Sequence, residues 1–305
     1  MQKCLKVDYM GTIYNVMKLY KYKINKNILL SLLAFIAISL VSIYSAQNMV
    51  NKGNLMLRQT IWYVASFLVI LIMLKIGNKK IYKSVPLFYI IGIISLISLL
   101  LFATPINNAK CWFNVFGIGT IQPSEFVKII LILINAIIIN KHNEKKGSKD
   151  YVLILKILGI TLVPSVLTFL QPDTGMILIY FIISFVMLFI SGIDIKWFVY
   201  LFLIASLLLS IFLSIYFYNE NFFIKIFGTN FFYRIDRLLD WKNGVGMQLN
   251  NALAGIGSAG LFGYGFNNTP IYFPEPQTDF IFSVFATNFG LVGSLILILI
   301  IVYFD

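Results

Sequence analysis

The chain of 305 residues is long enough for one large soluble domain or two smaller ones, but its composition excludes a soluble protein. Hydrophobic residues make up 59% and charged residues only 12%, with a mean hydropathy of +0.87, whereas a soluble domain carries roughly 25% charged residues. The sequence therefore predicts a protein that crosses a membrane several times. The net charge of +12 would favour nucleic-acid binding in a soluble protein. In a membrane protein such an excess more often reflects Lys and Arg in the cytoplasmic loops, so no nucleic-acid partner is predicted.

Apolar segments long enough for a membrane helix, about 20 residues, recur along the chain. In order they cover residues 28–46, 60–76, 84–103, 123–140, 151–170, 174–192, 196–217 and 281–304. This pattern predicts an all-α fold, a polytopic membrane helix bundle with about eight transmembrane helices. Residues 1–27 are too polar for a signal peptide and are predicted to form a cytoplasmic N-terminal tail, with residues 28–305 as one transmembrane domain.

The basic residues of the short loops predict the orientation. If the N-terminus is inside, most of them fall in inner segments: Lys3, Lys6, Lys18, Lys21, Lys23, Lys26, Lys75, Lys79, Lys80, Lys83, Lys141, Lys145, Lys146, Lys149 and Lys196. The short outer loops carry only Lys52, Arg58 and Lys110. Because Lys and Arg accumulate in cytoplasmic loops, both termini are predicted to be cytoplasmic. Residues 104–122 and the long loop 218–280 are then extracytoplasmic, and a loop of that length is usually functional.

The scarce acidic residues narrow the search for chemistry. Of the 12 Asp and Glu residues, four lie at or near the outer ends of spans: Glu125, Asp173, Glu275 and Asp279. An ionisable group at this depth is costly and is by default a functional candidate. The cysteines, Cys4 and Cys111, are far apart and His142 is the single histidine, so no metal ligand is predicted.

Glu125 and Lys128 are three residues apart at the start of the fourth span, so they can pair on one helix face. Pro123 suits the first position of that helix. Two interpretations stay open: an ion pair that seals the helix end, or a charged pair that faces a cavity and positions a polar substrate. For Asp173, in the turn 171–175, the favoured interpretation is structural, a cap on the free N–H groups of the next helix.

Asp279 lies where the long loop meets the last span, flanked by Phe280 and Phe282. Partial desolvation there would make its carboxylate a stronger base, as a general base requires. The alternative is a helix cap. Upstream, the many small residues of 253–266 would let backbone approach backbone or a ligand closely. No Lys-Ser or Lys-Thr pair follows them, so a nucleotide-binding loop is not predicted.

Five motifs, in this order, are similar to those of the SEDS family, which includes RodA, FtsW and SpoVE. They are Ser42-Ile43-Tyr44-Ser45-Ala46, Gln122-Pro123-Ser124-Glu125 with Lys128, the Gln171-Pro172-Asp173 turn, the Gly-rich stretch 255–265 and Thr278-Asp279-Phe280-Ile281-Phe282. The similarity runs from the first span to the end of the chain. Family members have about ten spans, so the transmembrane domain of this chain is expected to be incomplete at its C-terminus.

The resemblance implies a peptidoglycan glycosyltransferase that polymerises lipid II at the outer face of the cytoplasmic membrane of a bacterium, during cell elongation or division. It implies undecaprenyl pyrophosphate as a product, a class B penicillin-binding protein as partner and the lipid bilayer as surroundings. The Asp of the last motif, here Asp279, is the family's essential catalytic residue. Glu125 and Lys128 match residues that line the same cavity in the family. The substrate-binding candidates are completed by Lys110, Trp112, Gln122, Asp173, Gln248, Glu275 and Thr278.

The pyrophosphate leaving group needs cations, for which Lys128 and Lys110 are candidates. A divalent cation such as Mg²⁺ is a candidate cofactor. Two departures from the family pattern stand out: Cys111 replaces the usual Arg before Trp112, and residues 286–289 replace a Glu-Glu pair before a glycine. Two alternative functions stay open, a lipid II flippase or transporter, and a non-catalytic scaffold of the division or elongation machinery.

Overall fold

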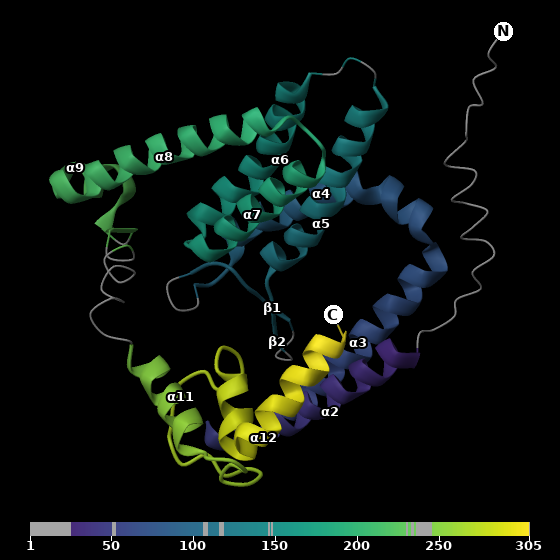
Figure 1. Ribbon diagram of the computed structural model, residues 1–305, viewed down its shortest axis with the longest axis vertical. Coiled ribbons are helices and arrows are strands. Elements are labelled where there is room, and N and C mark those ends of the chain that lie inside the picture. Colours follow the sequence, from purple (N-terminus) through teal and green to yellow (C-terminus); the bar gives the residue numbers. More distant parts are fainter. Residues whose placement is uncertain are drawn as a thin grey trace. The chain divides into compact units, whose positions relative to one another are not determined.

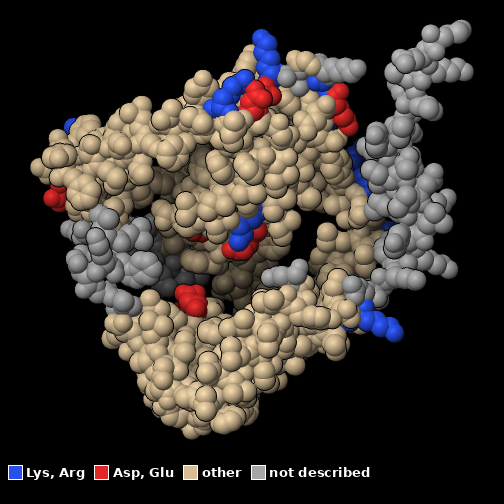
Figure 2. Space-filling model, viewed as in Figure 1, with Lys and Arg blue, Asp and Glu red and all other residues tan. Residues whose placement is uncertain are grey.

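The computed structural model is a polytopic helical protein and confirms the predicted all-α architecture (Figure 1). It describes residues 26–304 except 51–52, 106–108, 116–118, 146, 148, 230, 233–234 and 236–245. The predicted cytoplasmic tail, residues 1–27, therefore lies almost wholly outside the described residues. On the face shown in Figure 2, charged side chains occupy a few places and uncharged residues cover most of the rest, as expected for helices in contact with lipid.

Each of the eight predicted spans is a helix. They are α2 (Lys26–Met49), α3 (Leu55–Ile76), α4 (Asn78–Phe102), α5 (Pro123–Glu144), α6 (Asp150–Leu170), α7 (Thr174–Ile190), α8 (Ile195–Tyr218) and α12 (Ile281–Phe304). Seven of them are long and apolar enough to cross a membrane, judged by length and composition. The eighth, α7, is apolar but has only 17 residues. The chain is thus a multi-pass membrane protein.

The two predicted outer segments contain secondary structure that the hydropathy pattern did not predict. The long loop holds α9 (Glu220–Phe227) and α11 (Met247–Ser258). The shorter segment holds two antiparallel strands, β1 (Phe113–Val115) and β2 (Gly119–Ile121). All four elements are much shorter than a membrane span, so a search for long apolar runs passes over them.

Contacts divide the chain into two compact units, and each is described by itself. One comprises Met1–Trp62 with Leu238–Asp305, and the other comprises Tyr63–Arg237. In the second unit α4, α5, α6 and α7 pack together (Figure 1). Buried apolar side chains from α4, α5 and α7 form its main core: Val85, Leu96, Val127, Leu131, Ile134, Ile137, Met176 and Tyr180. This packing fixes the ends of α5 and α7, where the predicted polar residues lie.

In the first unit α2 and α11 pack against α12. Ala46, Ala252, Phe273 and Val284 form its buried core. Two of these are alanines, so the helix backbones approach closely, as is common where membrane helices associate through small residues.

Helix α12 is broken at Gly290, whose φ of 65° and ψ of −160° are not helical. The break opens two helical hydrogen bonds, those that Leu291 and Val292 would donate to carbonyls four residues back. Four backbone hydrogen bonds of 3.0 Å to the Gly-rich loop replace them: Leu291 N to Gly260 O, Val292 N to Leu261 O, Tyr264 N to Thr287 O and Gly265 N to Asn288 O. The carbonyls of Thr287 and Asn288 and the N–H groups of Leu291 and Val292 therefore have new partners in the loop.

Close contact of two backbones makes this exchange possible. A Cβ added at Gly290 would lie 2.3 Å from the backbone nitrogen of Gly263, and one added at Gly263 would lie 2.3 Å from the carbonyl oxygen of Asn288. Both glycines also have positive φ, 65° and 75°. The Gly-rich stretch thus brings backbone against backbone, which is one of the two uses predicted from its small residues.

We expect Gly290→Ala to destabilise the protein by about 3 kcal/mol or more, because the new Cβ would overlap the loop backbone and the positive φ disfavours any side chain. The measurement is the apparent Tm of the purified chain in detergent. Gly257→Ala is the matched control, since an added Cβ there meets nothing within 4 Å and alanine favours the helix. Equal Tm values for the two variants would contradict the role assigned to Gly290.

Candidate functional site

The first group of predicted polar residues lies at the N-terminal end of α5. Gln122 is the N-cap residue and Pro123 occupies the first turn, as predicted. Glu125 follows in the same turn, where a negative charge is favourable beside the free N–H groups. Its Oε2 lies 2.7 Å from Nζ of Lys128, and both side chains are partly accessible. The predicted ion pair is confirmed, and it leaves two ammonium hydrogens of Lys128 for another acceptor.

Asp173 links the start of α7 to the start of α5. It is the N-cap residue of α7, and its Oδ1 accepts a hydrogen bond of 3.3 Å from the backbone N–H of Met176. The predicted cap is therefore confirmed. Its Oδ2 accepts a second, shorter bond of 2.7 Å from Nε2 of Gln122. One carboxylate thus holds two helix ends together.

Burial raises the pKa of the Asp173 carboxyl above its ordinary value of 3.8. The hydrogen bonds from Met176 and Gln122 act in the opposite direction, and so does the charge of Lys128, while the negative charge of Glu125 adds to the rise. Removal from water dominates because it penalises only the charged form. The site therefore contains a carboxyl that is protonated more readily than an exposed aspartic acid.

Gln171 was not among the predicted site residues, yet it connects three elements around this group. Its side chain is buried, and its Nε2 donates a hydrogen bond of 2.8 Å to the carbonyl of Leu96 in α4. Its own carbonyl accepts from the Sγ of Cys111, 3.1 Å away, just before β1. The residue that replaces the family's usual Arg is therefore a buried thiol that attaches the hairpin to the Gln171–Asp173 turn.

Lys110 and Trp112 lie on either side of that thiol. Nζ of Lys110 donates a hydrogen bond of 3.2 Å to the carbonyl of Leu100, in the last turn of α4. Carbonyls in a last helical turn lack helical partners and attract cations. Trp112 is half-buried. Both residues belong to the same unit as Gln122, Glu125, Lys128 and Asp173, and their predicted roles in substrate binding stay predictions.

The second group of predicted residues precedes α12 in the other unit. Glu275 has a positive φ of 52°, and its carbonyl accepts hydrogen bonds from the N–H groups of Thr278 and Phe280 at 3.3 and 3.4 Å. A non-glycine residue in this conformation is strained. Its Oε2 accepts a bond of 2.6 Å from Nε2 of Gln277. These contacts form a tight turn that carries Asp279. Gln248, another predicted residue of this unit, lies in the first turn of α11 and is exposed.

The Asp279 side chain is exposed, and no hydrogen bond or ion pair engages it in the part of the chain that the structure describes. The described contacts of its unit leave Asp279 exposed, so its partial desolvation at the edge of the membrane stays a prediction. Phe280 contributes to the core instead, packing on Phe273 with ring centroids 5.9 Å apart, and Phe282 is exposed. The alternative, a helix cap, is wrong, because no N–H of α12 donates to this carboxylate.

A buried polar residue beneath this turn was missed. Asn288 lies inside α12, next to the break, and is fully buried. Its Nδ2 donates a hydrogen bond of 2.7 Å to Oγ of Ser45 in α2, and its Oδ1 accepts one of 3.1 Å from Oγ1 of Thr269. The signal that could have found it is an amide in an otherwise apolar span. A neutral side chain fits here, because a buried carboxylate would carry a charge that no described cation compensates.

Within the described residues, no three His, Cys, Asp or Glu side chains come together in a way that could hold a metal ion. The carboxylates of Glu125 and Asp173 are already bonded within the protein. The divalent cation therefore stays a prediction, and no role is assigned to it.

Comparison with known proteins gives relatives along nearly the whole chain. The sequence profile of the FtsW, RodA and SpoVE family, described as "Cell cycle protein", matches residues 21–304. The "Probable peptidoglycan glycosyltransferase FtsW" of Buchnera aphidicola subsp. Schizaphis graminum is 30% identical over 256 residues, which cover 81% of this chain and 67% of that protein. The "Peptidoglycan glycosyltransferase MrdB" of Escherichia coli is 30% identical over 286 residues, which cover 91% of this chain and 73% of that protein.

The fold also matches a solved structure. A chain of the structure described as "Structural coordination of polymerization and crosslinking by a peptidoglycan synthase complex" superposes with a TM-score of 0.64. The match covers 88% of this chain and 73% of that chain at 21% identity, so it speaks for the fold alone.

We expect Asp173→Ala to lower the apparent Tm, because the change removes the α7 cap and leaves the Gln122 amide without its partner. The cap alone is worth about 1 kcal/mol and the unpaired amide roughly 1–3 kcal/mol. Asp194→Ala is the matched control, because Asp194 is the N-cap residue of α8 without a cap hydrogen bond and its ion pair with Lys196 is exposed. A loss as large in the control would contradict the bridging role of Asp173.

The raised pKa of Asp173 predicts a pH dependence of stability. Because the native state holds the proton at pH values where the unfolded chain has lost it, the free energy of unfolding rises as the pH falls through the folded-state pKa. The gain is complete at the unfolded value of 3.8. The Tm of the unmodified chain, relative to Asp173→Asn, should therefore increase between neutral pH and 3.8. A decrease over this range would mean that the two hydrogen bonds outweigh burial.

Proposed function

The chain belongs to the FtsW, RodA and SpoVE family of cell cycle proteins, and on that premise we propose that it is a peptidoglycan glycosyltransferase. It polymerises lipid II at the outer face of the cytoplasmic membrane of a bacterium, during elongation or division of the cell. The names of its relatives from Buchnera and Escherichia support the activity. The observation that carries the proposal is the exposed, unpartnered carboxylate of Asp279 on a turn held by strained backbone.

Asp279 acts as the general base. The 4-hydroxyl oxygen of the acceptor sugar attacks the anomeric carbon of the donor, and the carboxylate takes the hydroxyl proton as the new glycosidic bond forms. The bond from the anomeric carbon to the pyrophosphate oxygen breaks, and undecaprenyl pyrophosphate leaves with the electron pair. A carboxylate without internal hydrogen bonds suits this role, because nothing in the described protein competes with the substrate hydroxyl.

The leaving pyrophosphate gains negative charge, which cations stabilise in the transition state. Lys128 is one candidate, since its ion pair with Glu125 uses only one of its three donor hydrogens. Lys110 is the other, although the Leu100 carbonyl holds one of its hydrogens. Glu125 would then set the position of Lys128. Both lysines lie in the unit that also contains Asp173.

The remaining predicted residues have binding roles in this proposal. Gln122 and Asp173 would orient polar groups of the substrate at the ends of α5 and α7, and Trp112 would contact a sugar ring. Gln248, Glu275 and Thr278 would do the same in the unit that carries Asp279. A divalent cation such as Mg²⁺ would bind mainly to the pyrophosphate oxygens and would need only one or two carboxylates of the protein.

A flippase would need a polar path through the membrane. The centre of the second unit, as far as the structure describes it, instead holds a small cluster of uncharged side chains that bond to one another. Nδ2 of Asn135 in α5 lies 3.2 Å from Oγ of Ser184 in α7, which is 2.5 Å from Oγ1 of Thr161 in α6. These side chains are buried, uncharged and bonded to one another. Such contacts join membrane helices, so this seam favours a closed bundle over a transport path.

The matched complex concerns polymerization and crosslinking by a peptidoglycan synthase, which supports a crosslinking partner. We propose that this partner is a class B penicillin-binding protein. In this proposal the chain polymerises lipid II, and the resulting polymer is the substrate that the partner crosslinks.

We expect Asp279→Ala to abolish polymerisation of lipid II by the full chain, with its partner, in liposomes. A general base contributes typically 10²–10⁴-fold to a rate, so at least a hundredfold loss is expected. Asp194→Asn is the control: it removes an exposed carboxylate outside the proposed site and should keep full activity. Both variants should keep the Tm of the unmodified chain.

The same liposomes distinguish the alternatives. Fluorescent lipid II would report translocation in parallel with polymer formation. Retained polymerisation by Asp279→Ala would contradict the assigned base, whereas translocation without polymer from the unmodified chain would favour a flippase. Full complementation of a deletion strain by Asp279→Ala would favour a scaffold.

A further inference from the structure

A cavity of about 300 Å³ lies between the C-terminal end of α5 and the N-terminal end of α6. Its lining includes four lysines and the only histidine of the chain: Lys141, Lys145, Lys149, Lys156 and His142. Its volume is at the lower end of the range for small-molecule sites, roughly 300–1,000 Å³. It lies at the opposite end of α5 from Glu125, which is the predicted cytoplasmic side. None of the proposed catalytic residues line it.

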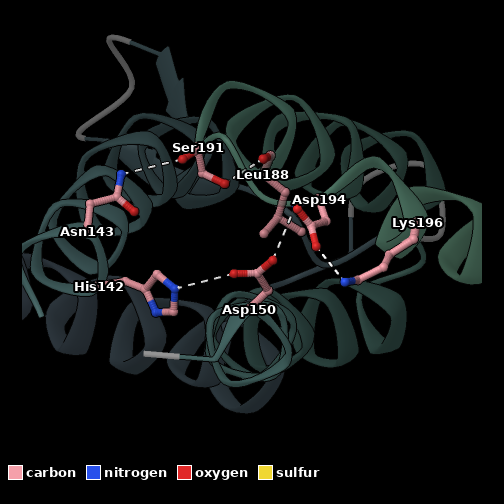
Figure 3. Close-up of polar contacts among 7 residues, drawn as sticks. All are labelled: His142, Asn143, Asp150, Leu188, Ser191, Asp194 and Lys196. Carbon is pink, nitrogen blue, oxygen red and sulfur yellow. Dashed lines mark hydrogen bonds and ion pairs between the residues drawn. The ribbon is translucent and has the colours of Figure 1, made fainter. Parts of the chain in front are cut away.

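The nearby carboxylates are engaged by other groups (Figure 3). Asp150 faces His142, with Oδ1 and Nε2 4.0 Å apart, and its Oδ2 accepts from the backbone N–H of Asp194 at 3.3 Å. Asp194 in turn pairs with Lys196, 2.5 Å away. Neither Asp150 nor Asp194 forms an ion pair with a lysine of the cavity.

Glu144 is also engaged, since its Oε1 accepts a hydrogen bond of 2.8 Å from Nδ2 of Asn140. Among the described side chains, no carboxylate pairs with Lys141, Lys145 or Lys156. Lys149 has only a ring contact, 5.8 Å from the centre of the Tyr151 ring. Four lysines thus line one cavity without an ion pair to any described carboxylate, an arrangement that favours an anionic ligand.

The walls of this cavity are held in place. Asn143, near the end of α5, donates a hydrogen bond of 3.4 Å to the carbonyl of Ser191 after α7, and Asp150 binds the N–H of Asp194 before α8 (Figure 3). These contacts fix both helix ends against the α7–α8 turn. The site is therefore preorganised, which reduces the entropy lost on binding.

The apolar part of the lining indicates the source of the anion. Ile138 lies nearly two turns before the end of α5 and Val152 lies in the first turn of α6, and both line the cavity with the lysines. A soluble anion would gain nothing from these side chains, whereas the glycerol and upper acyl carbons of a phospholipid would contact them. Basic cavities between membrane helices on the cytoplasmic side suit anionic lipid headgroups. We propose that this cavity binds the phosphate headgroup of an anionic phospholipid of the inner leaflet.

The positive-inside rule explains why lysines occur on this side, but it does not place them around a cavity. Lys80 and Lys83 provide a comparison within the same unit: they lie at the start of α4 on the same predicted side and are not part of the cavity lining. A general attraction to anionic membranes would depend on both lysine groups alike. A bound lipid would depend only on the group at the cavity.

The test uses the full chain in detergent, titrated with short-chain phosphatidylglycerol and followed by native mass spectrometry. Lys145→Gln/Lys149→Gln should weaken binding about tenfold or more, because each lysine near an anionic headgroup contributes about fivefold. Lys80→Gln/Lys83→Gln, with the same loss of charge, should bind as the unmodified chain does. Lys145→Arg/Lys149→Arg should retain binding, which controls for folding.

Two further probes identify the source of the anion. Phosphatidylcholine of the same chain length and inorganic phosphate should both bind at least tenfold more weakly than phosphatidylglycerol. Equal loss in the two glutamine variants would overturn the proposal in favour of general charge attraction. Inorganic phosphate bound as tightly as the lipid would overturn it in favour of a soluble-anion site.

Discussion

A backbone N–H or C=O in the apolar layer of a membrane must find its partner inside the protein, and this constraint shapes the unit that carries Asp279. The break at Gly290 frees two donors and two acceptors in α12, and the loop 260–265 bonds all four. Because the loop and the helix approach at backbone distance, both need glycine at the contact. The segment between them, which ends in the turn of Asp279, is thereby held at both ends. The exposed carboxylate of Asp279 is thus carried by a firmly anchored chain.

Side chains meet the same constraint in the other unit. The polar groups of the turn after α6 bond to four neighbours. The Gln171 side chain donates to α4 and the Gln171 carbonyl accepts from Cys111. The Asp173 carboxylate accepts from Gln122 and from the first turn of α7. At this end the charges are paired or bonded. At the opposite end of α5 four lysines surround a cavity without partners among the described carboxylates. The two ends of α5 therefore differ: polar groups are bonded to one another at one end, and lysines without ion pairs line a cavity at the other.

Features that depend on nearby residues could be predicted from the sequence. The eight spans follow from local hydropathy, the Glu125–Lys128 pair from helical spacing, and the Asp173 cap from a turn next to a helix start. The break at Gly290 could not be predicted, because the loop that stabilises it lies about 30 residues earlier in the chain. The packing around Asp279 could not be predicted for a similar reason: Phe280 packs on the ring of Phe273 and not around the carboxylate. The hydrogen bonds of Asn288 could not be predicted either, because its partners lie far away in the sequence, in α2 and in the long loop.

The length of α7 has a consequence for the lipid around it. At 1.5 Å per residue its 17 residues extend about 25 Å, less than the roughly 30 Å of a hydrocarbon layer. A helix this short is accommodated by local thinning of the bilayer, or by flanking residues that reach the membrane surface from a deeper position. Asp173, in the turn before α7, would then lie nearer to headgroup water than a residue at the end of a longer helix.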